Sequence, residues 1–285
     1  GDENLPLVLE TDEAFNTFEN IEIDNLLVTN IDNDHLDYFE SFTNLVEAFT
    51  RVINKVKQTV VINYDDDNLR KIQINNFITY GEHKEVDIRI SEPNIISYQK
   101  KNHTVDSALI GKHYLSNIAG AIALCTLYKL SISEILEAIS KFSGVKRRLE
   151  YIGTYKEVKF YDDYGHHPTE IKATISALKK NTLGKLFVIF QPHRFTRTRD
   201  NFEQLQESLE DADFAVVTDV YSAGEEPIPG ISSKNFKGKN IKYIKSLRSV
   251  PIYIKENIKS GDNVLTLGAG DVTLLGPQIL KYLND

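Results

Sequence analysis

The second half of the chain alternates between short, continuously apolar segments and longer amphipathic ones. The apolar segments are LFVIFQ (186–191), FAVVTDV (214–220), IKYI (241–244) and NVLTLGAG (263–270), and the segments with helical spacing cover 199–212 and 247–259. Strands that are apolar at every position are buried on both faces, which is typical of a parallel sheet covered by helices. With YKEVKFYDDY (155–164) in front, the pattern predicts an α/β domain over residues 149–285.

The first half is less regular, but it also mixes strands and helices. Strands are predicted at LPLVLE (5–10), LLVTNI (26–31) and TVVINY (59–64), several short ones within 72–110, and helices at 41–56, 113–129 and 132–142. A chain of 285 residues is long enough for two domains. We therefore expect a front α/β domain over residues 1–148, with GVKRR (144–148) leading into the second domain.

Composition excludes several classes of function. The net charge of −8 gives no basic surface for a nucleic-acid backbone, so we expect no nucleic-acid partner. No apolar run reaches the roughly 18–20 residues that cross a bilayer, and no signal peptide opens the sequence, so no membrane partner is expected. The single cysteine, Cys125, excludes a disulfide framework, and a reducing cytoplasm is the expected compartment.

Polar or glycine-rich residues follow five of the predicted strands. They begin at Glu10, Asn30, Asp162, Pro192 and Gly268. Each group alone could be a helix cap or a solvated loop. Ligands of open parallel sheets collect at the carboxyl ends of strands, so the five groups together predict a binding site. Carboxylates suit Mg²⁺, and arginines suit phosphate or carboxylate groups.

Other chemistries find little support. The adjacent histidines His166 and His167 point in different directions, and no Cys-x-x-Cys or His-Glu-x-x-His accompanies them, so zinc is disfavoured. A serine hydrolase would need Gly-x-Ser-x-Gly, which is absent. GAGDV (268–272) is only a fragment of a dinucleotide fingerprint and follows the last strand rather than the first.

Several segments resemble one family. YDDYGHHPTEI (161–171), FQPHRFTRTRD (190–200), VYSAGEEPIPG (220–230) and LGAGDVTLLGP (267–277) are similar to the carboxy-terminal domain of the Mur ligases. LETDEAF (9–15), VTNIDNDHLDYF (28–39), GKHYLSNIAGAIAL (111–124) and GVKRRLEYIG (144–153) are similar to the central ATPase domain of that family. The resemblance covers essentially the whole chain. It implies an α/β fold: a truncated Mur ligase central ATPase domain followed by a Rossmann-like carboxy-terminal domain.

The resemblance implies a reaction and its ligands. It points to the branch of the family that uses ATP and Mg²⁺ to join UDP-N-acetylmuramate to L-alanine, two small-molecule substrates of peptidoglycan precursor synthesis. A carboxylate is a poor electrophile, and phosphorylation by ATP would convert it to an acyl phosphate that the amine attacks. Such a site needs cations around the transferring phosphoryl group.

The resemblance also assigns roles to individual residues. The implied metal ligands are His35 and Glu10, with Asp12 or Glu13 as less favoured choices in place of Glu10. The implied nucleotide-binding residues are His113, Asn117, Arg148 and Asp163. The implied substrate-binding residues are Asn30, His166, His167, His193, Arg194 and Arg197. The implied catalytic residues are Arg148, His166, His167 and Arg194. Tyr114 stands where the family usually has asparagine, which puts one adenine contact in doubt.

The sequence departs from the family in one large respect. No G-x-x-x-x-G-K-[ST] loop occurs in it, and Gly111-Lys112-His113 does not fit that pattern. The chain also has no methionine, even at position 1, so we expect a trimmed protein. Without backbone amides and a lysine to hold the β- and γ-phosphates, the chain alone is expected to be inactive. The front domain is expected to be less stable than the back one.

Two alternatives remain at this point. The first is the related ligase that recycles a tripeptide onto the same nucleotide sugar. The second is a non-catalytic nucleotide-binding module that kept the fold without the phosphate loop. The segments around His35, Arg148 and Asp163 argue against the second alternative, because a decayed site would not be expected to keep them.

Overall fold

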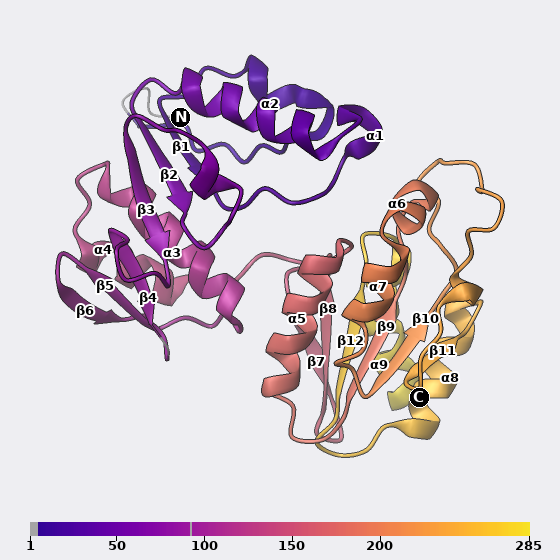
Figure 1. Ribbon diagram of the computed structural model, residues 1–285. Helices are drawn as coiled ribbons and strands as arrows, with labels where there is room; N and C mark the ends of the chain where they lie inside the picture. The colour runs from indigo at the N-terminus through magenta and orange to yellow at the C-terminus, as the bar shows by residue number, and fades with distance from the viewer. Residues whose placement is uncertain (1–4, 92) are drawn as a thin grey trace. The chain divides into compact units, whose positions relative to one another are not determined.

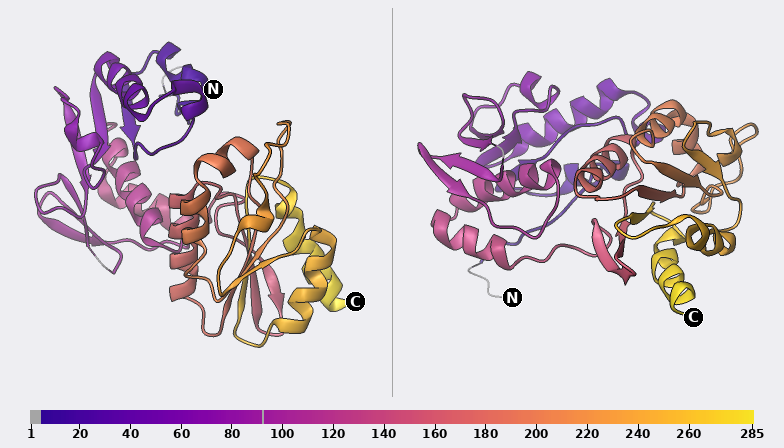
Figure 2. Two further views of the ribbon diagram at one scale, coloured as in Figure 1. Left: turned by 45° about the vertical axis from the view of Figure 1, so that its right-hand side comes forward. Right: turned by 90° about the horizontal axis from the view of Figure 1, so that it is seen from below.

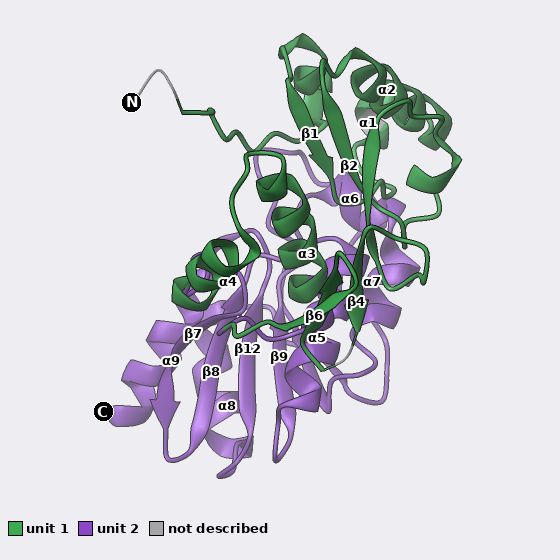
Figure 3. Cartoon of the chain, turned by 90° about the vertical axis from the view of Figure 1, so that its left-hand side faces the viewer, with its two compact units in different colours: residues 1–107, 114–142 green, residues 108–113, 143–285 purple. Residues whose placement is uncertain are grey.

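The computed structural model describes residues 5–91 and 93–285, and the chain divides into two compact units. Unit 1 comprises residues 1–107 and 114–142, and unit 2 comprises residues 108–113 and 143–285 (Figure 3). Helix α3 (Lys112–Thr126) therefore begins in residues of unit 2 and continues in unit 1. No helix in the described part of the chain is long and apolar enough to span a membrane.

Unit 1 is built on a six-stranded sheet whose strands lie side by side in chain order. They are β1 (Asn25–Val28), β2 (Thr59–Asn63), β3 (Phe77–Gly81), β4 (Ile88–Ser91), β5 (Ile95–Tyr98) and β6 (Lys101–Thr104). The pairs from β1 to β4 are parallel, and β4, β5 and β6 form an antiparallel meander. The several short strands predicted within 72–110 are confirmed.

Helices and 3₁₀ turns surround this sheet. They are η1 (Ala14–Asn20), α1 (Leu36–Phe39), α2 (Phe42–Lys55), η2 (Leu69–Lys71), α3 and α4 (Ile132–Lys141). Leu45 and Val52 of α2 are buried in one apolar cluster with Val60 and Ile62 of β2. Gly120 of α3 lies so close to Tyr80 and Leu27 that a Cβ would meet the Tyr80 ring at 2.9 Å. The glycine thus allows α3 to approach the sheet closely.

The predicted strand at residues 5–10 is wrong. These residues belong to no strand, and Leu7 and Val8 are 89% and 82% exposed. In the described part of the chain, β1 pairs only with β2, and residues 5–10 pair with no strand. An apolar segment becomes a strand only where a neighbour satisfies its backbone groups, and the sequence pattern does not report that neighbour.

Unit 2 is built on a second six-stranded sheet with the order β11-β10-β9-β12-β8-β7. Its strands are β7 (Glu150–Tyr155), β8 (Val158–Asp163), β9 (Leu186–Phe190), β10 (Phe214–Val217), β11 (Ile241–Tyr243) and β12 (Asn263–Leu267). All neighbouring pairs are parallel except β7–β8. The strand predicted over 155–164 is confirmed as β8, but the prediction missed β7, which precedes β8 and pairs with it as an antiparallel hairpin. Lys156 and Glu157 form its two-residue turn with φ of 44° and 65°, the left-handed conformation that such turns require.

Helices cover both faces of the second sheet (Figures 1 and 2). They are α5 (Pro168–Lys180), α6 (Phe195–Asp200), α7 (Phe202–Ser208), α8 (Val250–Asn257) and α9 (Leu275–Asn284), with 3₁₀ turns η3 (Ser233–Asn235), η4 (Leu247–Ser249) and η5 (Asp271–Leu274). Helices α5 and α7 contact each other, as do α8 and α9. The helix predicted over 199–212 is observed as the end of α6 and the whole of α7, which ends at Ser208; Asn201 between the two helices leaves the helical region, with φ of −121°.

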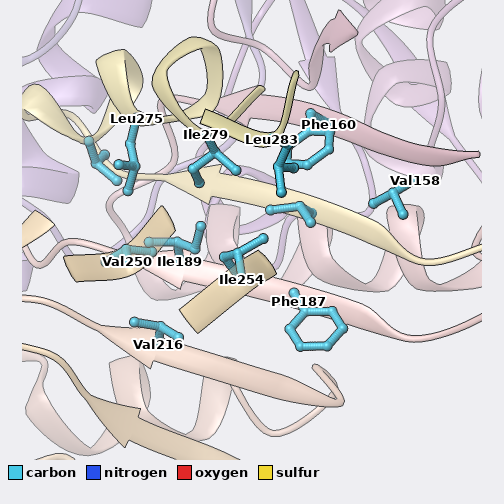
Figure 4. Packing of buried hydrophobic residues seen from close by; sticks show 12 residues of the cluster. Val158, Phe160, Phe187, Ile189, Val216, Val250, Ile254, Leu275, Ile279 and Leu283 are labelled. Atoms are coloured by element: carbon cyan, nitrogen blue, oxygen red, sulfur yellow. The ribbon is translucent and has the colours of Figure 1, made fainter. Parts of the chain in front are cut away.

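One apolar core of unit 2 lies between the sheet and helices α8 and α9 (Figure 4). Ile254 of α8 and Ile279 of α9 pack with Phe187, Ile189 and Val264 of the central strands, and all five are at most 1% exposed. Strands β9 and β12 are buried at every position, so both faces of the sheet are buried there, as predicted.

The strand order of unit 2 reverses direction once. The chain leaves β8 for β9 and only later returns to insert β12 between them. At such a reversal, neighbouring loops diverge to opposite faces of the sheet, and ligands of open α/β sheets bind there. The carboxyl ends of β8, β12 and β9 are therefore the expected location of a site in unit 2.

Candidate active site at the carboxyl edge of the second sheet

The register of unit 2 aligns the ends of its central strands. Leu267 of β12 lies opposite both Asp163 of β8 and Phe190 of β9, and Phe190 lies opposite Val217 of β10. The loops that follow these strands consequently leave the sheet at one edge. The three polar strand ends predicted in the second half of the sequence are neighbours in space.

Four aromatic rings lie in sequence along this edge, and we call them the ring row: Tyr164, His166, His193 and Tyr221. Ring centroids are 5.2 Å apart between Tyr164 and His166, and 6.1 Å apart between His166 and His193. The last pair, His193 and Tyr221, is stacked at 5.4 Å with 12° between the planes. The row joins loops after β8, β9 and β10, so it brings His166 and His193 together as candidate substrate-binding residues.

His193 is held in its neutral form at physiological pH. Burial lowers its pKa to about 4, and the charges of His166, Arg197 and Arg194 add to this effect, while Glu225 opposes it. Its ring atom Nδ1 is buried without a hydrogen-bond partner in the described part of the chain. A buried polar atom without a partner is costly, so this nitrogen is suited to a ligand.

Glu170 organises the loop that carries the adjacent histidines. Its carboxylate accepts hydrogen bonds from the backbone amides of His166 (3.2 Å) and His167 (3.4 Å) and from Nη1 of Arg148 (3.3 Å). Burial alone would raise its pKa, but the charges of His166 and Arg148 and the amide donors lower it. Glu170 is thus an ionised anchor for Arg148, a role that sequence reasoning missed.

The two adjacent histidines do point in different directions, as predicted. The ring of His166 lies in the ring row, whereas Nδ1 of His167 accepts the amide of Thr169 at 3.4 Å and caps helix α5. His167 is 8% exposed. The structure gives His167 a capping role, and its predicted contact with substrate stays a prediction.

His113, Arg148 and Glu170 come together in unit 2. Burial lowers the pKa of His113 to about 4, with a further contribution from the Arg148 charge and an opposing one from Glu170. Asn117 is exposed and follows His113 by one turn of helix α3. Two residues expected to bind nucleotide, His113 and Arg148, therefore lie close in space.

Asp163 ends β8 with its carboxylate buried. Its oxygens accept the amides of Leu149 (2.7 Å) and Gly165 (2.8 Å), which fixes the start of β7 against the end of β8. Burial raises its pKa to about 6, although both amides and Arg148 favour the ionised form. Its binding of ribose hydroxyls stays a prediction.

Arg147 connects the basic linker to the glycine loop after β12. Its Nη2 donates to the carbonyl oxygens of Gly268 (2.8 Å) and Gly270 (3.3 Å), and its guanidinium carbon lies 4.7 Å from the centroid of Tyr164. Gly268 has φ of 144°, and a Cβ there would lie 2.7 Å from the carbonyl oxygen of Gln191. In the sequence, Arg147 was identified only as part of the GVKRR segment (144–148) that leads into the second domain.

The arginines after β9 belong to helix α6 and its start. Nε of Arg194 donates to Oε1 of Glu225 at 2.6 Å, and Arg194 has φ of 70°. Arg197 is 9% exposed within α6. Both arginines contribute to the electrostatic environment of His193, which agrees with a site for an anionic substrate.

The remaining predicted residues belong to unit 1. Asn30 is exposed just after β1, and Glu10 is exposed in the segment before η1. His35 precedes α1 with φ of 55°, its amide donates to Asp34 at 2.9 Å, and its ring Nε2 lies 3.9 Å from the Asp34 carboxylate. Asp66, which sequence reasoning missed, accepts the amide of Ile31 at 3.3 Å and so supports the loop after β1.

The predicted metal ligands do not form a metal centre by themselves. Within residues 5–91 and 93–285, no group of three or more histidine, cysteine, aspartate or glutamate side chains could hold a metal ion. Mg²⁺ takes six oxygen ligands and is commonly held by one or two carboxylates together with substrate phosphates. Roles for Glu10, Asp12, Glu13 and His35 therefore stay predictions that depend on a bound nucleotide.

Comparison with known proteins gives two family matches. Residues 8–125 match the Mur ligase middle domain, and residues 147–270 match the Mur ligase glutamate ligase domain. A protein of Endomicrobium trichonymphae named UDP-N-acetylmuramate–L-alanine ligase is 40% identical over 97% of this chain and 65% of its own length. One of the same name from Dictyoglomus turgidum is 35% identical over 96% of this chain and 64% of its own length. The chain thus spans just under two thirds of these curated relatives.

Solved structures share the fold. A UDP-N-acetylmuramate–alanine ligase from Thermotoga maritima superposes with a TM-score of 0.73 at 23% identity, over 93% of this chain and 61% of that one. MurF ligase from the same organism, solved in complex with ADP, gives a TM-score of 0.76 at 21% identity, over 92% of this chain and 63% of that one. A murein peptide ligase from Psychrobacter arcticus gives a TM-score of 0.65 at 20% sequence identity, over 94% of this chain and 59% of that one. The two domain matches, in the order seen along the sequence, show that the chain belongs to the Mur ligase family.

Proposed function

We propose that the complete product of this gene is an ATP-dependent ligase that joins L-alanine to UDP-N-acetylmuramate. The observation that carries the proposal is the set of curated relatives of that name, such as the two that are 40% and 35% identical across nearly the whole chain. Because the chain spans 65% and 64% of those relatives, the activity is proposed for the whole protein.

The proposed chemistry has two steps. A carboxylate oxygen of UDP-N-acetylmuramate attacks the γ-phosphorus of ATP, which gives an acyl phosphate and releases ADP. The neutral amine of L-alanine then attacks the acyl carbon, the tetrahedral intermediate loses inorganic phosphate, and the amine proton passes to solvent or a nearby base. When bound, Mg²⁺ would offset the charge of ATP phosphate groups.

The residues of unit 2 divide between these steps by position. Arg148, anchored by Glu170 and near His113, is assigned to the nucleotide. His166, His193 and Arg194 are assigned to the substrates. The neutral imidazole of His193 can accept a hydrogen bond from the amine of L-alanine without repelling it. Guanidinium groups bind carboxylates through paired donors, and Arg194 and Arg197 supply that chemistry.

We further propose that this chain alone does not turn over. Its 285 residues contain no G-x-x-x-x-G-K-[ST] loop, so they lack the lysine and backbone amides that hold the β- and γ-phosphates. The test measures phosphate release from ATP with UDP-N-acetylmuramate and L-alanine, for this chain and for the complete gene product. Activity of the complete product only is expected. Comparable turnover by this chain would overturn the second proposal.

The same assay separates the alternatives. A murein peptide ligase shares the fold of this chain, so the choice of acceptor separates the two functions. L-alanine should support phosphate release by the complete product, and a tripeptide should not. Preference for the tripeptide would identify the recycling ligase. Nucleotide binding without phosphate release with either acceptor would identify a non-catalytic module.

A further inference from the structure

Glu225 lies in a loop that sequence motifs mark but that the proposed roles leave without a function. The loop follows β10, and its turn is made by Ala223 and Gly224, with φ of 50° and 86°. The turn places Glu225 beside the first residues of α6, although about 30 residues separate them in sequence. The side chain of Glu225 is 18% exposed, whereas its neighbour Glu226 is an exposed residue.

The Glu225 carboxylate makes three hydrogen bonds to the segment that follows β9. Oε1 accepts from Nε of Arg194 and from Oγ1 of Thr196, each at 2.6 Å, and Oε2 accepts from the amide of Thr196 at 3.0 Å. Burial alone would raise the pKa of Glu225, but the Thr196 donors and Arg194 lower it. The carboxylate is therefore ionised, and its bond to Arg194 is charge-assisted.

The backbone reinforces the same connection. The amide of Arg194 donates to the carbonyl oxygen of Tyr221 at 2.8 Å, and the amide of Tyr221 donates to the carbonyl oxygen of Pro192 at 2.8 Å. Tyr221 also stacks on His193, so Arg194 and the last ring of the ring row are held by one loop. Arg194 nevertheless adopts a positive φ of 70° with ψ of 136°, a backbone conformation that is strained in a residue other than glycine. Such a backbone persists only where its surroundings fix it.

We propose that Glu225 is a positioning residue that fixes the Arg194 guanidinium for the carboxylate of one of the two acid substrates, UDP-N-acetylmuramate or L-alanine. The inference rests on the proposed ligase function. Glu225 bonds Arg194 through Nε, which orients the plane of the guanidinium and directs its terminal nitrogens. Because a bidentate arginine–carboxylate pair depends on this plane, a freely rotating Arg194 would bind a carboxylate less well.

The test compares Glu225→Gln with Glu226→Gln in the complete gene product. Both changes remove one carboxylate charge, but Glu226 is exposed and adjacent to the site rather than in it. We expect Glu225→Gln to raise KM for one acid substrate roughly tenfold, the scale of one charge-assisted hydrogen bond, with KM for ATP unchanged. Glu226→Gln should leave all three KM values at the wild-type level.

Each result is decisive. A wild-type KM for both acid substrates in Glu225→Gln overturns the inference while the ligase function stands. A wild-type protein without ligase activity overturns the proposed function, and the inference falls with it. If Glu225→Gln does not fold, Glu225→Asp keeps the charge on a shorter side chain and should show the same selective rise in KM. An equal rise in KM for ATP would indicate a general structural defect and would also overturn the inference.

Discussion

The buried carboxyl of Asp163 gives unit 2 a specific dependence of stability on pH. Burial raises the pKa of Asp163 from 3.8 to about 6. The carboxyl of Asp163 therefore stays protonated up to a higher pH in the folded chain than in the unfolded chain. Between about pH 4 and 6 the unfolded chain ionises freely while the folded chain resists, so this group makes the free energy of unfolding fall as pH rises through that window. Above the window its effect is constant.

The size of the effect follows from the shift. About two pKa units at 1.36 kcal/mol each give about 3 kcal/mol. His113 and His193 act in the opposite direction, because burial lowers the pKa of each to about 4 and the folded chain loses stability as pH falls below their unfolded values. The pH dependence of the free energy of unfolding of the wild-type chain alone would therefore combine opposing contributions from Asp163 and the two histidines.

Substitution of Asp163 by asparagine isolates the contribution of this carboxyl. Asparagine cannot ionise, but its amide nitrogen would face one of the two N–H donors, from Leu149 or Gly165, at a cost of about 1–3 kcal/mol. The variant should be less stable than wild type near pH 4. Its deficit should shrink by about 3 kcal/mol by pH 7, because only the wild type then carries the cost of a buried charge.

The assay follows urea unfolding of both chains across this pH range through the NMR signals of β12, which report on unit 2. A ¹³C titration of the Asp163 carboxyl measures its pKa directly. A constant difference in stability between the two chains from pH 4 to 7, or a carboxyl that titrates below pH 4 in the folded chain, would refute the reasoning.

Three further outcomes are expected. Gly268→Ala should lower the free energy of unfolding of unit 2 by about 1–3 kcal/mol, measured by urea denaturation, because φ of 144° and the carbonyl of Gln191 leave no room for a Cβ; an unchanged midpoint would contradict this. Ile279→Ala should cost about 2–5 kcal/mol in the same assay, since the side chain is fully buried, and a loss below 1 kcal/mol would show that the core collapses around it. Amide hydrogen exchange should be faster in β1, which has one neighbour in the described chain, than in β12, which has two; equal protection would contradict the expected difference in stability.

The sequence alone predicted those strands and helices whose formation depends on residues within the same element. The apolar segments 186–191 and 263–270 were correctly predicted to contain strands, observed at Leu186–Phe190 and Asn263–Leu267, because burial on both faces needs apolar residues at every position. The helix that starts after Ser131 was predicted because capping chemistry acts within one turn, and Ser131 and Glu134 form the capping box. The strand ends at Asp163 and Gly268 were identified as one edge because chain direction and parallel pairing fix which end of each strand meets its neighbours.

Only the tertiary structure decided how the polar residues at that edge are used. Two adjacent histidines look equivalent in sequence, yet His167 caps a helix and His166 faces His193, because the start of α5 separates their directions. Glu170 and Glu225 bond to groups that strand crossovers bring near, and no spacing along the chain reports those distances. The exposed segment at residues 5–10 makes the same point, because an apolar pattern specifies a surface to be buried but not whether a neighbouring strand is present to bury it.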